Sequence, residues 1–188
     1  MAVQRGVDKW KLKKWFSVYA PKMFNSELIG EIPASSEKAV AGRNLTVGLD
    51  QLTHNPSNAF TNMVFKITEV NGESASTKLV GMELMFSYIR SLVRRYRSVA
   101  YAVVTLPSKD GKSVTVKPLI VTSIRTTRSK IVGIRKEAEQ IIREFISSND
   151  SDAIVSAIIE GKVQADMAAR LKHITQINKV EIRKLELG

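Results

Sequence analysis

Four arginines stand close together in residues 87–104, which read SYIRSLVRRYRSVAYAVV, and no acidic residue in this segment could neutralise them. The four are Arg90, Arg94, Arg95 and Arg97. A guanidinium group presents its N–H donors in a planar fork that matches the oxygens of a phosphate or a carboxylate. This residue type at this spacing therefore predicts a surface that binds anions.

A second basic group follows at residues 124–135, which read IRTTRSKIVGIR and again contain no acid. Its cations are Arg125, Arg128, Lys130 and Arg135. The serine and threonine hydroxyls between them are further groups that bond phosphate oxygens. A solvated basic surface is the ordinary alternative for either group alone. Two such groups in one chain favour contact with nucleic acid.

The net charge of +11 is concentrated in two parts of the 188-residue chain. Residues 1–22 carry +5 and residues 90–135 carry +10, whereas residues 23–89 carry −3 and residues 136–188 carry −1. Concentrated positive charge is typical of surfaces that attract polyanions. Nucleic acid is therefore the leading candidate partner.

The first basic part, VDKWKLKKWFSVYAPKMF, interleaves aromatic residues with lysines. The lysines expected to touch phosphate are Lys9, Lys11, Lys13 and Lys14. Aromatic side chains stack on unpaired bases in proteins that bind single strands, but more often they pin a terminal segment to the core. We expect core packing for Trp15 and Tyr19, and both roles stay open for Trp10.

The chain offers little material for catalysis. Its two histidines, His54 and His173, stand far apart and in no metal-binding motif. Neither a P-loop nor a dinucleotide-binding glycine pattern occurs. We therefore expect no metal, no cofactor, no small-molecule substrate and no enzymatic activity. An RNA-modifying or RNA-processing enzyme that docks its substrate on the basic surface is the alternative.

Membrane insertion is not expected, because the longest apolar runs are far shorter than the roughly 20 residues that cross a bilayer. A basic module for anionic membranes is disfavoured, since no long amphipathic helix accompanies the charge. The chain has no cysteine, which fits a reducing compartment. A soluble, cytoplasmic protein is predicted.

Apolar periodicity predicts that the four arginines lie on a helix over residues 85–97. At about 100° per residue, Arg90, Arg94 and Arg97 fall within about 60° of one another, on the side away from the apolar stripe. Arg95 falls outside this group. The helix is therefore expected to bury one face and to present three guanidinium groups on the other.

The remaining pattern predicts an α+β fold, with one antiparallel sheet or barrel and a helical C-terminal part, because a run of strands precedes a run of helices. Strands are expected at residues 14–21, 44–52, 60–70, 76–84, 99–106, 113–123 and 179–187, and helices at residues 133–147, 151–159 and 166–174. Asn71-Gly72 and Asp110-Gly111 are the expected hairpin turns. Residues 27–30 read as a short helical turn, and loop follows. The expected parts are a basic arm (1–14), a β-rich core (15–132) and a helical C-terminal part (133–188).

Three spaced motifs resemble the S3Ae (S-three-Ae) family of small-subunit ribosomal proteins of archaea and eukaryotes. They are DKWKLKKWFSVYAP at residues 8–21, AGRNLTVGLDQLT at residues 41–53 and YIRSLVRRYRS at residues 88–98. The resemblance departs from the family where Thr46, Val47 and Gly48 replace a usual acidic position. A polar, often histidine-containing stretch is replaced by Gly81-Met82-Glu83. A short C-terminal tail suggests an archaeal source.

The resemblance implies an antiparallel β-barrel-like core with packed helices and a structural role in the ribosome, in the cytoplasm. Its implied partners are small-subunit ribosomal RNA on the platform, neighbouring platform proteins and messenger RNA near its exit. The implied RNA-binding residues are Lys9, Lys11, Lys13, Lys14, Arg43, Arg90, Arg94, Arg95 and Arg97. The role is assembly and translation rather than catalysis.

Overall fold

The computed structural model describes Trp10 and residues 13–188, and it divides into two compact units. The first unit comprises the described residues up to Ala59 together with Met63–Leu79. The second comprises Phe60–Asn62 and Val80–Gly188. The three-part division predicted from the sequence, with boundaries after residues 14 and 132, stays a prediction.

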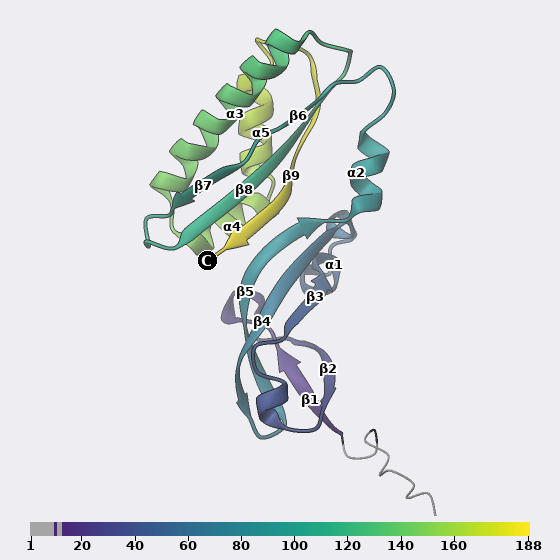
Figure 1. Ribbon diagram of the computed structural model, residues 1–188, viewed down its shortest axis with the longest axis vertical. Helices are drawn as coiled ribbons and strands as arrows, with labels where there is room; N and C mark the ends of the chain where they lie inside the picture. The colour runs from purple at the N-terminus through teal and green to yellow at the C-terminus, as the bar shows by residue number, and fades with distance from the viewer. Residues whose placement is uncertain (1–9, 11–12) are drawn as a thin grey trace, which may run out of the picture. The chain divides into compact units, whose positions relative to one another are not determined.

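The first unit consists of strands joined by short helical turns (Figure 1). Its elements are β1 (Lys14–Tyr19), η1 (Lys22–Phe24), β2 (Leu28–Ala34), η2 (Glu37–Ala39), β3 (Asn44–Gly48), α1 (Leu49–Thr53), η3 (Pro56–Asn58) and most of β4 (Thr61–Asn71) and β5 (Ser74–Leu84). Gly72, with φ 62°, lies in the turn between β4 and β5. The hairpin predicted at Asn71-Gly72 is therefore confirmed.

Strand β1 turns alternate side chains toward the core of this unit. Phe16 and Val18 are buried and pack with residues that include Val40. Trp15 and Tyr19 are instead 56% and 38% exposed. The prediction that these two aromatic residues pack in the core is wrong. Successive side chains of a strand point to opposite faces, and Phe16 and Val18 occupy the face that packs in the core.

Two other segments of the first unit differ from the prediction. Residues 28–34 form β2, which pairs antiparallel with β1, where the sequence predicts a helical turn and a loop. Pairing with β1 satisfies the backbone groups of this segment, which outweighs its weak local signals. The strand predicted over residues 44–52 ends at Gly48, and α1 follows it directly.

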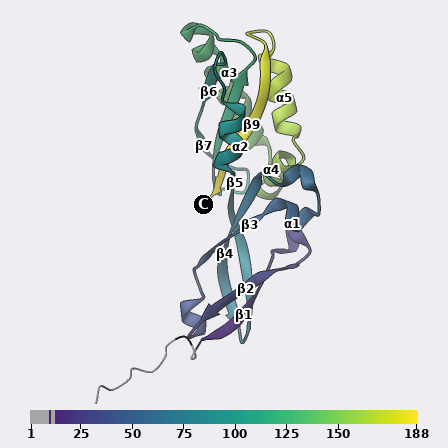
Figure 2. The same ribbon diagram turned by 90° about the vertical axis from the view of Figure 1, so that its right-hand side faces the viewer.

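The second unit packs helices against long strands. Its further elements are α2 (Phe86–Leu92), β6 (Val99–Tyr101), β7 (Val104–Pro107), β8 (Ser113–Thr122), α3 (Arg128–Ser148), α4 (Ser151–Ile159), α5 (Lys162–Leu171) and β9 (Ile177–Leu187). Figures 1 and 2 show α3 and α5 running alongside strands β6–β9. Helix α3 buries Ile134, Ala138, Ile142 and Ile146 at helical spacing, so its amphipathic pattern explains its position.

The nine strands of the described residues form one open sheet, which confirms the α+β class but not the barrel. Their order is β2-β1-β5-β9-β8-β6, with β4 beside β5, β3 beside β4 and β7 beside β8. No pairing among the described residues joins the ends of this order, so the expected barrel-like core is wrong. The beginning of β5 pairs with β1, in parallel, and its end pairs antiparallel with β9. The order therefore continues into a second group of strands instead of closing.

The hairpin between β7 and β8 holds the start of α4. The carboxylate Oδ2 of Asp110 accepts hydrogen bonds from the backbone N–H of Ser151 (3.0 Å) and from its Oγ (3.1 Å). The backbone hydrogen bond from Ser151 holds the pKa of Asp110 below its usual value. The sequence predicts Asp150 or Ser151 as the cap. Asp150 occupies the N-cap position, but the bonding side chain comes from Asp110.

Candidate nucleic-acid interface

The arginine segment forms a short helix followed by a loop. Helix α2 ends at Leu92, and Val93 is extended (φ −81°, ψ 100°), so the helix predicted to run to residue 97 is too long. A longer helix would stack Arg94 next to Arg90 with no acid to offset their repulsion. It would also leave too few residues to connect the helix to β6, which begins at Val99.

Ser98 bonds this loop to the end of β8. Its N–H donates to Oγ1 of Thr122 (2.9 Å), and its carbonyl oxygen accepts from the N–H of Thr122 (2.9 Å). The N–H of Thr126 donates to Oγ of Ser98 (3.0 Å). Strand β6 then pairs Val99 with Val121 of β8. These contacts bring the two basic groups of the sequence side by side.

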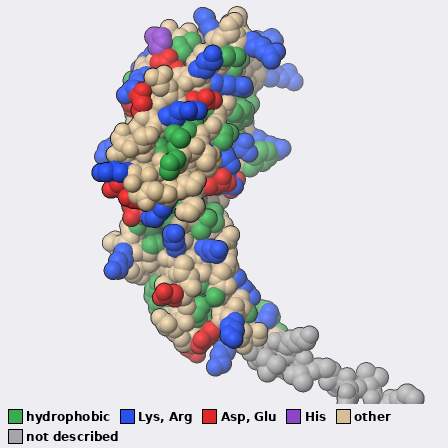
Figure 3. Space-filling model, turned by 60° about the vertical axis from the view of Figure 1, so that its left-hand side comes forward, with side chains coloured by type: hydrophobic (Ala, Val, Ile, Leu, Met, Phe, Trp, Pro, Cys, Tyr) green, Lys and Arg blue, Asp and Glu red, His purple; other side chains and the backbone are tan. Residues whose placement is uncertain are grey.

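Six cations lie on these two loops and on the first turn of α3, and we call them the basic corner. They are Arg94, Arg95, Arg97, Arg125, Arg128 and Lys130. Five are exposed and Arg97 is half-buried. None forms an ion pair with a residue that the structure describes. Figure 3 shows lysine and arginine side chains at the upper end of this unit, where α3 begins in Figure 1.

Arg90 and Arg135 lie on the helices that lead away from the basic corner. The guanidinium carbon of Arg90 is 4.4 Å from the centre of the Phe86 ring. Arg135 lies on α3, about two turns beyond Arg128. Both are exposed, and neither has an ion-pair partner within the described part of the chain. They are therefore free to add to the same positive surface.

The predicted cations of the first unit gather near the beginning of β1. Lys14 is the first residue of β1, and Nη1 of Arg43 lies 3.5 Å from the carbonyl oxygen of Pro33, next to the strand paired with β1. The Nζ of Lys13 is 4.3 Å from the centre of the Trp10 indole ring. Lys9 and Lys11 lie outside the described residues, so their predicted contacts stay predictions.

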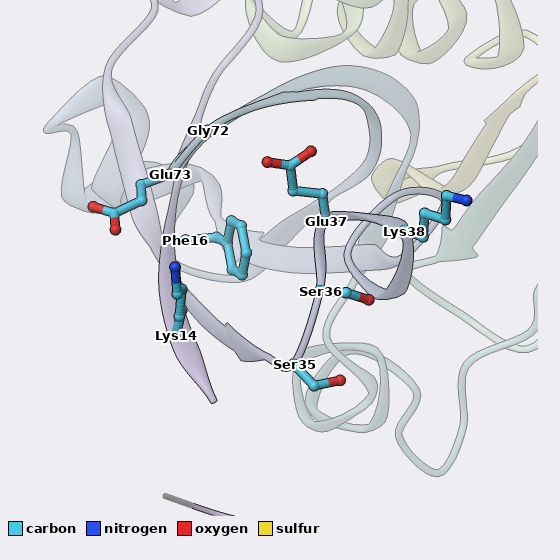
Figure 4. Close-up of a pocket in the computed structure, with 8 residues that line it drawn as sticks. All are labelled: Lys14, Phe16, Ser35, Ser36, Glu37, Lys38, Gly72 and Glu73. Atoms are coloured by element: carbon cyan, nitrogen blue, oxygen red, sulfur yellow. The ribbon is translucent and has the colours of Figure 1, made fainter. Parts of the chain in front are cut away.

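A pocket of ≈ 590 Å³ opens beside Lys14. Figure 4 shows the residues that line it: Lys14, Phe16, Ser35, Ser36, Glu37, Lys38, Gly72 and Glu73. Its lysines are accompanied by as many glutamates, so it lacks the uniform positive charge of the basic corner. The basic corner is therefore the stronger candidate for a polyanion.

The described residues contain no group of histidine, cysteine, aspartate or glutamate side chains that could hold a metal ion. In the same part of the chain, no helix is long and apolar enough to cross a membrane.

Comparison with known proteins identifies the family. A model of the ribosomal S3Ae family matches residues 1–188, the whole sequence. The chain belongs to this family. The small ribosomal subunit protein eS1 of Sulfolobus acidocaldarius is 39% identical over 181 residues, which cover 96% of this chain and 92% of the relative. The eS1 proteins of Archaeoglobus fulgidus (37%, covering 96% and 86%) and Methanococcus vannielii (34%, covering 96% and 82%) are also similar.

Membership of the S3Ae family confirms the resemblance found in the three sequence motifs. The relatives named above are archaeal, which supports the predicted source. The S3Ae proteins are structural components of the ribosome, so the expectation that this chain is not an enzyme holds and the modifying-enzyme alternative is not supported.

Sequence reasoning missed the residues that assemble the interface of this S3Ae protein. Ser98, Thr122 and Thr126 hold the two loops together, yet each is a common polar residue with no local signal. The helix predicted over residues 85–97 includes Tyr96, but its φ of 64° places it in a turn. Glycine or asparagine usually marks a turn position with positive φ, and a tyrosine between two arginines gives no such sequence signal.

Proposed function

We propose that this chain is a structural protein of the small ribosomal subunit and that the basic corner binds ribosomal RNA through phosphate groups. The observation that carries the proposal is the set of cations on two adjoining loops without ion-pair partners among the described residues. The names of the relatives, small ribosomal subunit protein eS1, support the ribosomal setting.

The proposal extends to the location and the other contacts. The family resemblance supports a place on the platform near the messenger RNA exit, beside neighbouring platform proteins, in cytoplasmic ribosomes. Lys13, Lys14 and Arg43 form a second, smaller phosphate contact in the first unit, together with Lys9 and Lys11. Recognition is by RNA shape and backbone, because the deep major groove of an RNA helix does not admit side chains.

The salt dependence of RNA binding tests this proposal. Protein bound to about six to ten phosphates releases as many counterions, so its affinity falls about a thousandfold or more between low and moderate salt. We expect this fall when the full chain is titrated with small-subunit ribosomal RNA. A salt response that is flat would contradict phosphate binding.

A gradient experiment separates the structural role from a substrate-processing role. A structural protein is expected in stoichiometric amount with small subunits sedimented through a salt-containing gradient. A processing enzyme is expected in substoichiometric amount, mainly in precursor fractions. The second outcome would overturn the structural assignment while leaving RNA binding in place.

A further inference from the structure

Tyr96 lies within the basic corner but contributes nothing visible to the core. Its side chain is 84% exposed, the largest value among the exposed large hydrophobic side chains that the structure describes. Its φ of 64° lies in the left-handed region, where the Cβ of a bulky residue crowds the following carbonyl oxygen. An exposed side chain on a backbone with an unfavourable φ adds little to the stability of the fold, which points to a role in binding.

The surrounding turn imposes this conformation. The N–H of Arg97 donates to the carbonyl oxygen of Arg94 (3.4 Å), which closes a turn with Tyr96 at its third position. Glycine or asparagine normally occupies this position when φ is positive. The N–H of Val93 bonds to Ile89 at one end of the loop, and Ser98 is bonded to β8 at the other. Hydrogen bonds thus hold the loop at both ends, and the ring of Tyr96 is exposed to solvent.

The neighbours of Tyr96 supply the other half of a nucleotide site. Arg95 and Arg97 are its neighbours in the sequence and Arg94 precedes them, so the same short loop carries three arginines and one exposed ring. No hydrogen bond joins the Tyr96 hydroxyl to any residue in the described part of the chain, and none of the arginines is ion-paired there. Exposed aromatic rings stack on bases, and guanidinium groups beside them bind the phosphates.

We propose that Tyr96 stacks on an unpaired RNA base while Arg94, Arg95 and Arg97 bind the adjoining phosphates. This inference rests on the proposed function and specifies its ligand: RNA that contains an unpaired nucleotide beside a helix. A base inside a continuous duplex has both faces covered by its neighbours and offers no face to a tyrosine. The site therefore distinguishes RNA bulges and loops from uninterrupted helices.

Two RNA probes test the inference with the full-length protein. One is a blunt RNA duplex with a bulge of adenosines, and the other is the same duplex without the bulge. Tyr96→Asn removes the ring but tolerates the left-handed backbone, and Tyr96→Phe keeps the ring without the hydroxyl. Tyr101→Ala is the matched control, because Tyr101 belongs to the same unit, is 42% exposed and has no positive φ.

The bulged duplex is expected to lose affinity for Tyr96→Asn by between about fivefold and a hundredfold, the usual effect of removing a base-stacking ring. Binding of the fully paired duplex should stay the same. Tyr96→Phe and Tyr101→Ala should both bind like the parent protein. A 5-iodouridine placed in the bulge should crosslink to Tyr96, which peptide mass spectrometry would identify.

Other outcomes overturn the inference in distinguishable ways. An equal effect of Tyr96→Asn on the affinity for both RNAs, whether no change or the same loss, would overturn base stacking and leave phosphate binding by the basic corner intact. A parent protein that binds neither RNA would overturn both proposals together. Thermal unfolding supplies a separate check: Tyr96→Asn should unfold no lower than the parent. A clear decrease would show that the ring serves the fold instead.

Discussion

Two regions of the second unit hold similar numbers of cations and arrange them in opposite ways. Five cations on β8, β9 and α5, which we call the paired surface, have acidic partners: Lys117, Lys162, Arg170, Lys179 and Lys184. Glu186, for example, lies 2.9 Å from the Nζ of Lys117 and 2.9 Å from that of Lys184. In the basic corner, no cation has such a partner among the described residues.

The difference separates charges that belong to the fold from charges that await a ligand. A charge that folding brings next to its opposite gains only a modest energy at the surface, but it is locally neutral. Six neighbouring cations without acids repel one another, and a polyanion removes that repulsion. Damage to the paired surface should therefore change stability, whereas damage to the basic corner should change RNA affinity.

The largest stability effect is expected where the paired surface joins β5. A Cβ built on Gly81 would overlap the carbonyl oxygen of Leu185 on β9, next to Glu186. Gly81→Ala should therefore lower the free energy of unfolding by about 1–3 kcal/mol, as overpacked sites do. Denaturant unfolding measures this loss.

The matched control is Gly30→Ala, where a Cβ meets no atom within 4 Å. RNA affinity of Gly81→Ala, measured well below its unfolding temperature, should match that of the parent protein. Loss of RNA affinity by the folded Gly81→Ala protein would break the proposed separation of the two regions.

A smaller effect is expected at Glu186, whose pKa is held below its usual value by the hydrogen bonds from Lys184 and Lys117. A lowered carboxyl pKa contributes stability above the ordinary pKa of the unfolded chain, and the contribution is lost as the pH falls through the folded value. Because Glu186 is 42% exposed, the contribution is about 0.5–1 kcal/mol.

Glu186→Gln should therefore unfold more easily than the parent at neutral pH, and the difference should shrink as the pH falls below the ordinary carboxyl range. Denaturant unfolding at a series of pH values measures it. A difference that stays constant into acid would show that the carboxylate charge contributes nothing.

Local sequence signals predicted the parts of the fold that depend on neighbouring residues. Asn71-Gly72 marked a hairpin turn, and Gly161, with φ 77°, follows α4 where the sequence predicts its end. The period of α3 identified its buried face, although the helix begins at Arg128, before the predicted start. In each case the deciding interaction lies within a few residues of the signal.

Features that depend on distant contacts could not be predicted in the same way. Strand β2 exists because β1 pairs with it, and α4 is capped by Asp110, 41 residues away from Ser151. The open sheet depends on β5 having different partners at its two ends. No local pattern reports any of these pairings.

The candidate site, too, was predictable only in the part that depends on neighbouring residues. Residue types identified the arginines and lysines, because a run of cations without acids is visible in the sequence. Their meeting depends on Ser98 and Thr122, which lie on separate segments. Arg95, which did not fit the predicted helical stripe, lies in the loop beside Tyr96, where it is exposed. Because α2 ends at Leu92, no helical stripe sets Arg95 apart from the other arginines of the loop.

The measurement that tests the central claim most directly compares two triple variants of equal charge. Arg95, Arg125 and Arg128 have no side-chain hydrogen bond or ion pair with the described residues, so their joint change to serine should leave the fold intact. The control changes Lys162, Arg170 and Lys184 of the paired surface to serine. Small-subunit ribosomal RNA is titrated with each protein over a range of salt concentrations.

For the basic-corner variant, the slope of log affinity against log salt should become shallower by about two to three, because each lost phosphate contact removes about one. The control variant should change the slope by less than about one. Equal losses in the two variants would mean that RNA affinity follows net charge alone, and would contradict a binding site at the basic corner.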